Sequence, residues 1–211
     1  MTPSPAEVIL YDLGNVILPF NHYQIAERLL PFSHHQEFQD PQQIFSHLFD
    51  LEKGVINSYE TGKVSSRQFF QSLKDAFALS LSYEEFVPLW NDIFVEDRGV
   101  SEIILSQRKR VGLGLLSNTN PLHFDYIVSR FPIVRAFDRW ILSYEVGFKK
   151  PALEIFQKAL EWASTEPEKI IFIDDQKRHV DVALSLGIEG IHFISAGQLK
   201  EELSKKLKAH L

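Results

Sequence analysis

The sequence contains no cysteine and only one methionine. The absence of thiols excludes disulfides, thiolate metal sites and cysteine nucleophiles, and it fits a reducing compartment. The longest apolar runs, such as residues 8–11, are far too short to span a bilayer. The first residues show no basic segment followed by an apolar stretch, so we expect no signal peptide. We therefore expect a cytoplasmic protein that does not associate with membranes.

Basic residues are fewer than acidic residues. The chain of 211 residues carries 22 lysines and arginines against 28 aspartates and glutamates, which gives a formal net charge of −6. Proteins that bind nucleic acid usually show a basic excess, so we expect no nucleic-acid partner. Hydrophobic residues make up 45% of the chain and charged residues 24%, which is typical of a globular protein.

Short apolar runs, each followed by polar or turn-forming residues, are the main structural signal. Helical patterns separate the later runs, and this alternation predicts βαβ units. Continuous apolar strands indicate a parallel sheet covered on both faces, so we predict an α/β fold with a doubly wound parallel sheet. The predicted strands are 8–11, 111–116, 139–143, 169–173 and 191–194, and the predicted helices between and after them are 121–130, a helix from 150 onward, 178–186 and 198–211.

The segment from about residue 20 to residue 98 breaks this alternation. It shows helical patterns, many aromatic residues and no clear buried strand. We interpret it as an all-helical insertion after the first strand, with most of its aromatic residues forming its own core. The predicted helices of the insertion are 23–30, 41–49, 65–79 and 83–94.

Polar residues follow the predicted strands at the point where each strand ends. In an open parallel sheet the ligand crevice lies outside the carboxyl ends of the strands, so these side chains should converge. The crevice would then hold three carboxylates, one hydroxyl, one amide and one cation. The residues are Asp12, Ser117, Asn118, Lys150, Asp174 and Asp175.

This set of side chains suits phosphate chemistry with a metal ion. Crowded carboxylates repel one another and raise at least one pKa, and a divalent cation removes that conflict. Oxygen ligands suit Mg²⁺, while a lysine, a hydroxyl and the N-terminus of the helix near Pro121 suit a phosphoryl group. A remaining carboxylate can then attack phosphorus and form an acyl-phosphate.

Four short motifs, in this order, resemble those of the haloacid dehalogenase-like hydrolases. The segment from Asp12 to Val16 (Asp-Leu-Gly-Asn-Val) resembles the first motif of that family, and Ser117-Asn118 resembles the second. Lys150-Pro151 resembles the third motif and Asp174-Asp175 the fourth. The residues of these motifs are similar to those of a subgroup that includes a bacterial glucose-1-phosphate phosphatase.

The resemblance implies a role for each residue. Asp12 would be the nucleophile and, together with the backbone carbonyl of Gly14, a ligand of Mg²⁺. Asp175 would bind the metal directly and Asp174 mainly through water. Lys150 would also screen Asp12 from the incoming anion. The phosphoryl oxygens would be held by Ser117, Asn118 and Lys150.

The insertion lies between the first and second motifs, where the family often carries a helical cap. The resemblance therefore implies an α/β core of residues 1–18 and 99–211 and a helical cap of residues 19–98. The cap is expected to exclude water and to select the leaving group. His22 follows the first motif closely and is a candidate for lining the cleft.

Two positions depart from the family pattern. The commonest first motif has a second aspartate, the general acid and base, where this chain has Gly14. A positioned general acid contributes roughly 10²- to 10⁴-fold in rate, so its loss predicts a slower enzyme or one that relies on water. His179 stands where the similar subgroup commonly has asparagine, and it can still donate a hydrogen bond to a carboxylate.

The sequence therefore predicts a Mg²⁺-dependent phosphomonoester hydrolase for a small phosphorylated metabolite, such as a sugar phosphate. Two alternatives stay open. A metal-independent 2-haloacid dehalogenase would use the same aspartate on carbon, although two uncompensated acids at Asp174-Asp175 would repel its carboxylate substrate. A regulatory or binding homologue that has lost catalysis is compatible with Gly14.

Overall fold

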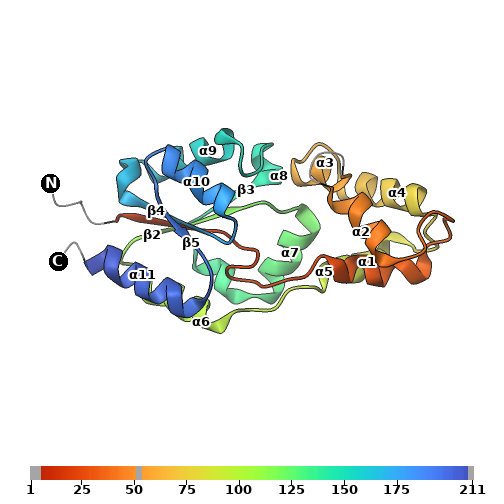
Figure 1. The fold of residues 1–211 in the computed structure, drawn as a ribbon, viewed down its shortest axis with the longest axis horizontal. Coiled ribbons are helices and arrows are strands. Elements are labelled where there is room, and N and C mark those ends of the chain that lie inside the picture. Colours follow the sequence, from red (N-terminus) through yellow and green to blue (C-terminus); the bar gives the residue numbers. More distant parts are fainter. Residues whose placement is uncertain (1–5, 51–53, 209–211) are drawn as a thin grey trace.

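The computed structural model describes residues 6–50 and 54–208, and it contains a five-stranded parallel sheet in the order β3-β2-β1-β4-β5 (Figure 1). Every described strand pair is parallel, so the carboxyl ends of the strands lie at one edge. This is the predicted doubly wound fold class. The strands are β1 (Val8–Tyr11), β2 (Gly112–Ser117), β3 (Arg139–Leu142), β4 (Ile170–Asp174) and β5 (Glu189–His192).

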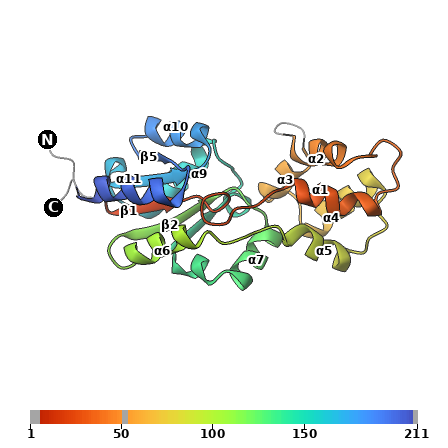
Figure 2. The same ribbon diagram turned by 60° about the horizontal axis from the view of Figure 1, so that its bottom comes forward.

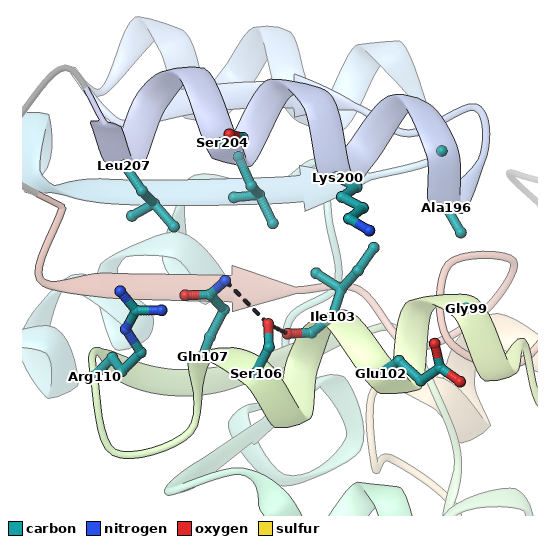
Figure 3. Close-up of a pocket in the computed structure, with 12 residues that line it drawn as sticks. Gly99, Glu102, Ile103, Ser106, Gln107, Arg110, Ala196, Lys200, Ser204 and Leu207 are labelled. Atoms are coloured by element: carbon teal, nitrogen blue, oxygen red, sulfur yellow. Dashed lines mark hydrogen bonds between the residues drawn. The ribbon is translucent and has the colours of Figure 1, made fainter.

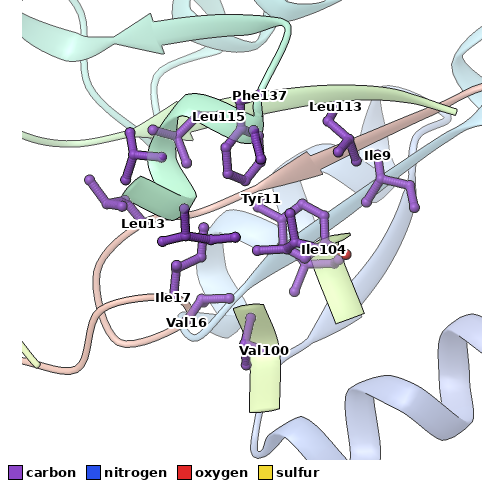
Figure 4. Close-up of a cluster of buried hydrophobic side chains, with 14 of the residues drawn as sticks. Ile9, Tyr11, Leu13, Val16, Ile17, Val100, Ile104, Leu113, Leu115 and Phe137 are labelled. Atoms are coloured by element: carbon purple, nitrogen blue, oxygen red, sulfur yellow. The ribbon is translucent and has the colours of Figure 1, made fainter. Parts of the chain in front are cut away.

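Helices cover both faces of the sheet, because alternate residues of each strand point to opposite sides. In β1, Ile9 and Tyr11 belong to the larger core cluster (Figure 4), whereas Val8 and Leu10 belong to a second cluster. The first face packs on α6 (Arg98–Gln107), α7 (Pro121–Arg130) and α11 (Ala196–Lys208). The second face packs on α9 (Leu153–Ala163) and α10 (Lys177–Ser185).

The inserted segment forms a separate helical layer with its own aromatic core, beyond the strand ends (Figure 2). Three of its helices begin with a capping box, in which Asp40, Ser65 or Ser82 accepts a hydrogen bond from the backbone three residues later. The helices are α1 (Tyr23–Leu29), α2 (Pro41–Phe49), α3 (Ile56–Glu60), α4 (Ser66–Phe77) and α5 (Tyr83–Asn91).

The two chain segments that connect the sheet to the inserted helices run side by side. Phe20 and Phe94 form an isolated antiparallel bridge, and the amide of Val95 donates to the carbonyl of Pro19 at 3.0 Å. The amide of Asp97 likewise donates to the carbonyl of Ile17 at 3.0 Å. These bonds tie the entry and the exit of the insertion together. The exact division at residues 18/19 and 98/99 stays a prediction.

Some elements differ from the sequence prediction. Strand β5 begins at Glu189 and ends at His192, so it lies two residues before the predicted run of 191–194. Helix α3 was not predicted at all. The remaining short elements are α8 (Ser143–Val146) and the 3-10 turns Leu30–Phe32, Pro132–Ala136 and Pro167–Lys169. No helix within residues 6–50 and 54–208 is long and apolar enough to cross a membrane.

Candidate active site

Three predicted acidic residues meet at the carboxyl edge of the sheet. Asp12 directly follows β1, and its amide donates to the carbonyl of Ile173 at 2.8 Å. Asp174 is the last residue of β4, and Asp175 follows it. Each of the three carboxylates offers an oxygen within 4.8 Å of the others. The predicted convergence of the strand ends is therefore confirmed for these residues.

Lys150 lies among these carboxylates and is only 1% exposed. Its Nζ is 2.9 Å from Oδ1 of Asp12 and 2.6 Å from Oδ2 of Asp174. The same ammonium group donates to the carbonyl of Leu116 at 2.8 Å. Burial opposes the charged form of this lysine, but Asp12 and Asp174 outweigh it and raise the pKa of Lys150, so the ammonium group stays charged.

The electrostatics of the cluster leave an excess of negative charge. Burial, with the neighbouring carboxylates, raises the pKa of Asp12 to about 8 although Lys150 opposes the shift. Burial and the charge of Asp174 also raise the pKa of Asp175. One lysine thus does not neutralise three carboxylates. A divalent cation would supply the missing positive charge. The donor atoms are all oxygens, which fits Mg²⁺.

Asp174 differs from the other two acids because its oxygens are already bonded. Oδ2 pairs with Lys150, while Oδ1 accepts from the amide of Gln176 at 2.8 Å. Nδ1 of His179 lies 3.0 Å from Oδ1 and 3.1 Å from Oδ2. Burial alone would raise the pKa of Asp174, but Lys150 and His179 outweigh it and hold that pKa well below its usual range. Its carboxylate therefore positions Lys150.

Asn118 contacts the backbone of the third motif rather than open space. Its Oδ1 accepts from the amide of Lys150 at 2.7 Å, and its Nδ2 donates to the Lys150 carbonyl at 2.9 Å. These two bonds fix the lysine beside Asp12. Because the Asn118 side chain is used in this way, any contact with a phosphoryl group would come from the backbone N–H of Asn118. Ser117 is buried at the end of β2, with its hydroxyl 3.5 Å from the Asn118 carbonyl.

A cleft of about 300 Å³ opens beside the carboxylates, between the strand ends and the inserted helices. A larger groove of about 580 Å³ lies between α6 and α11 (Figure 3). None of the site residues predicted from the sequence lines that groove, so the chemistry assigns the site to the smaller cleft. Its lining includes Asp12, Gly14, Asn118, Lys150, Asp175 and His179 from the core, and His22, Phe45, Phe49, Ile56, Asn57 and Glu60 from the insertion.

Comparison with known families agrees with the motif assignment. The family model described as haloacid dehalogenase-like hydrolase matches residues 44–193. The chain belongs to the haloacid dehalogenase-like hydrolases. The match includes the second, third and fourth motifs.

Relatives of this hydrolase family match over most of the chain. A D-ribitol-5-phosphate phosphatase from Bacteroides thetaiotaomicron is 31% identical over 160 residues, which cover 72% of this chain and 78% of that protein. A phosphorylated carbohydrates phosphatase from Thermotoga maritima is 30% identical over 111 residues, covering 52% of this chain and 51% of that protein. The crystal structure of a haloacid dehalogenase (HAD) family enzyme from Bacteroides thetaiotaomicron, in complex with magnesium and inorganic phosphate, matches this chain with a TM-score of 0.78 and 26% identity. The match covers 91% of this chain and 96% of that chain.

The structure explains how this family member accommodates glycine in its first motif. A Cβ atom at residue 14 would overlap Cε1 of Phe20. Phe20 lies on the segment that leads into the inserted helices, and its ring packs against Phe94 at a centroid distance of 5.5 Å. An aromatic ring therefore fills the place where the commonest first motif of the family starts its second aspartate.

Several cleft residues were not singled out from the sequence. Lys149 is one of them: its Nζ is 2.8 Å from Oε2 of Glu60, and it lines the cleft. Glu60 and Asn57 lie on the unpredicted helix α3, so no sequence signal had placed them. His22 lines the cleft, as its position after the first motif suggested.

Proposed function

We propose that this hydrolase cleaves small phosphomonoesters in a Mg²⁺-dependent reaction, and that its substrates are phosphorylated carbohydrates. The observation that carries the proposal is a cluster of three carboxylates, each with an oxygen within 4.8 Å of the others, two of which pair with the buried Lys150. That arrangement is suited to binding both a divalent cation and an anion. The names of the two curated relatives support a carbohydrate phosphate as the substrate class.

Asp12 is the proposed nucleophile because its carboxylate is held in one orientation. Oδ1 accepts from the Leu13 amide at 2.7 Å and lies 2.9 Å from Nζ of Lys150. Oδ2 has no hydrogen-bond partner within residues 6–50 and 54–208. Oδ2 is therefore the oxygen free to attack phosphorus. Lys150 favours the ionised form of the carboxylate and reduces its repulsion of a phosphate dianion, and bound Mg²⁺ would favour the same form.

The reaction has two steps. Asp12 forms a bond to phosphorus as the bond to the leaving oxygen breaks, which gives an aspartyl-phosphate and an alkoxide that takes a proton from water. Water then attacks the phosphorus of this intermediate, and inorganic phosphate leaves as Asp12 is regenerated. Since residue 14 is glycine, no acid side chain at that position assists the first step.

Mg²⁺ would be held by Asp12, Asp175 and the carbonyl of Gly14, with Asp174 reaching it through water because its own oxygens bond Lys150 and His179. When bound, the ion supplies positive charge that offsets the negative charge of the phosphoryl group. Lys150, with Ser117 and the backbone of Asn118, would hold the phosphoryl oxygens.

The test is turnover of an aryl phosphate with Mg²⁺ and with excess EDTA. An aryl phosphate has a leaving group that needs no protonation, so the absence of an acid at residue 14 does not obscure activity. We expect hydrolysis that EDTA abolishes and Mg²⁺ restores. Chloride release from a 2-chloro acid that survives EDTA would instead establish the dehalogenase, and no turnover of either substrate would favour a non-catalytic homologue.

A further inference from the structure

Helix α3 of the insertion brings two polar side chains into the active-site cleft. Asn57 and Glu60 lie three residues apart, so they project from the same face of the helix. Both contact the residue that precedes the catalytic lysine. Nζ of Lys149 is 2.5 Å from Oδ1 of Asn57 and 2.8 Å from Oε2 of Glu60.

Contacts other than Lys149 also fix the position of α3 over the core. The helix lies beside α8 (Figure 1). Gly62, in the turn that follows α3, has a φ of +67° and leaves no room for a Cβ beside the carbonyl of Tyr144. On the same helix, the hydroxyl of Tyr59 accepts from the amide of Leu122 at 3.2 Å. The backbone that carries Glu60 is thus held independently of the ion pair.

Of the two α3 side chains, Glu60 still has an oxygen that can accept a hydrogen bond. Asn57 uses Oδ1 for Lys149, and its Nδ2 donates to the Asp50 carbonyl at 3.1 Å. Oε1 of Glu60 has no hydrogen-bond partner among the residues that the structure describes. The Glu60 side chain is only 12% exposed and lines the cleft. The second oxygen of this carboxylate can therefore accept a hydrogen bond from a molecule bound in the cleft.

The wall of the cleft around this carboxylate is aromatic. Phe20, His22, Phe45 and Phe49 all line it. The His22 ring stacks on Phe49 with centroids 4.3 Å apart and planes 9° apart. Burial, helped by the charge of Lys149, lowers the pKa of His22 to about 4, so its ring is neutral at neutral pH. Such faces pack against C–H groups.

The charges of the cleft narrow the choice of leaving group. Lys150 is bonded to Asp12 and Asp174, and Lys149 is bonded to Glu60. Arg178 also lines the cleft and donates to the side chain of Gln176 rather than to Glu60. Lys149 is already paired with Glu60, so a second phosphate or a carboxylate placed against the free oxygen of Glu60 would be repelled by that oxygen and would find no hydrogen-bond donor there. Hydroxyl groups would be attracted, because they donate to a carboxylate at little desolvation cost. The cleft volume of about 300 Å³ suits a small leaving group.

We propose that Glu60 is a specificity-determining residue that accepts hydrogen bonds from hydroxyl groups of the leaving group, while the aromatic wall packs on its C–H face. The preferred leaving group is therefore an uncharged polyol or sugar. This inference rests on the proposed phosphatase function. It adds a residue of the insertion as the group that distinguishes a polyhydroxylated ester from a plain alkyl ester.

The test compares ribitol phosphate with pentyl phosphate, which share a carbon chain and differ in hydroxyl groups. We expect the wild-type kcat/KM to be higher for ribitol phosphate by roughly 10- to 100-fold, the range expected for hydrogen bonds to a charged group. Glu60→Gln and Glu60→Ala should reduce that ratio toward one. Glu84→Gln is the matched control, because Glu84 is 73% exposed on α5 and lies outside the cleft lining.

Each outcome decides between the two proposals. If Glu60→Gln lowers kcat/KM for both esters by the same factor, Glu60 only positions the insertion and the inference is wrong. If the wild type hydrolyses para-nitrophenyl phosphate with Mg²⁺ but does not prefer ribitol phosphate over pentyl phosphate, the phosphatase function stands and the inference fails. If no phosphate ester is hydrolysed, both are overturned.

Discussion

The ring of Phe20 occupies the space that any side chain at Gly14 would need. A Cβ at residue 14 would overlap Cε1 of that ring. Phe20 also bridges to Phe94, where the chain returns from the insertion to the core. Glycine in the first motif and phenylalanine six residues later are thus one structural feature.

This relationship predicts the outcome of restoring the acid. Gly14→Asp alone should lower both stability and activity, because the new side chain collides with the ring. Combined with Phe20→Ala, which makes room, the aspartate should raise kcat for an alkyl phosphate above that of Phe20→Ala alone by up to roughly 10²-fold. Steady-state kinetics with an alkyl and an aryl phosphate measure this. An equal gain for the aryl ester would contradict a general-acid effect.

Lys150 and Lys149 provide a matched pair of adjacent lysines. Lys150→Met leaves Asp12 and Asp174 buried beside each other without their cation, which should lower the free energy of unfolding by about 3–5 kcal/mol in the absence of metal. Lys149 is 27% exposed, so Lys149→Met should cost only about 1 kcal/mol or less. Urea unfolding with EDTA present measures both. Equal losses would mean that the buried cluster is not the stabilising feature.

Mg²⁺ affinity should depend on pH through Asp12. Burial raises the pKa of its carboxyl to about 8 in the metal-free protein. Below that pH the metal must displace a proton, so the affinity should rise by about tenfold per pH unit between pH 6 and 8 and level off above it. Calorimetric titrations over this range test the slope. Asp12→Asn should bind Mg²⁺ weakly and lose most of the pH dependence, and a slope that survives in this variant would assign the proton elsewhere.

His123 should make the fold sensitive to acid. Burial is the largest cause that lowers its pKa to about 3, and its Nε2 lies 3.0 Å from the Trp90 carbonyl. Between pH 6.5 and 3 the unfolded chain binds a proton there that the folded chain does not, so stability is lost as the pH falls. From pH 6 to 4, the free energy of unfolding of the wild type should fall by about 1.4 kcal/mol per pH unit more than that of His123→Gln. Parallel pH profiles from denaturant unfolding would contradict this.

The sequence predicted the core well because each strand there is a continuous apolar run with a polar end. Asn120 caps α7, which begins at Pro121 and ends at Arg130 as predicted. β5 was placed two residues too late, because Phe193 and Ile194 continue the apolar run after strand pairing has ended at His192. Periodicity cannot detect where pairing ends.

The candidate site was predictable where a residue follows a strand and was not where it lies on the insertion. Asp12, Asp174 and Asp175 converge because the strand ends converge. Helix α3 has only five residues and no side-chain cap, so nothing in its sequence marked Glu60 as a cleft residue. Its place depends on tertiary contacts with the core, such as the hydrogen bond from the Leu122 amide to the Tyr59 hydroxyl.

The central claim is that Asp12 attacks phosphorus. Acid quenching of the enzyme during turnover of a phosphorus-radiolabelled aryl phosphate with Mg²⁺ tests it most directly. We predict label bound covalently to the peptide that contains Asp12, no label on the Asp12→Asn variant, and loss of turnover in that variant. Full phosphatase activity in a clean preparation of Asp12→Asn, or label on another peptide, would contradict the account.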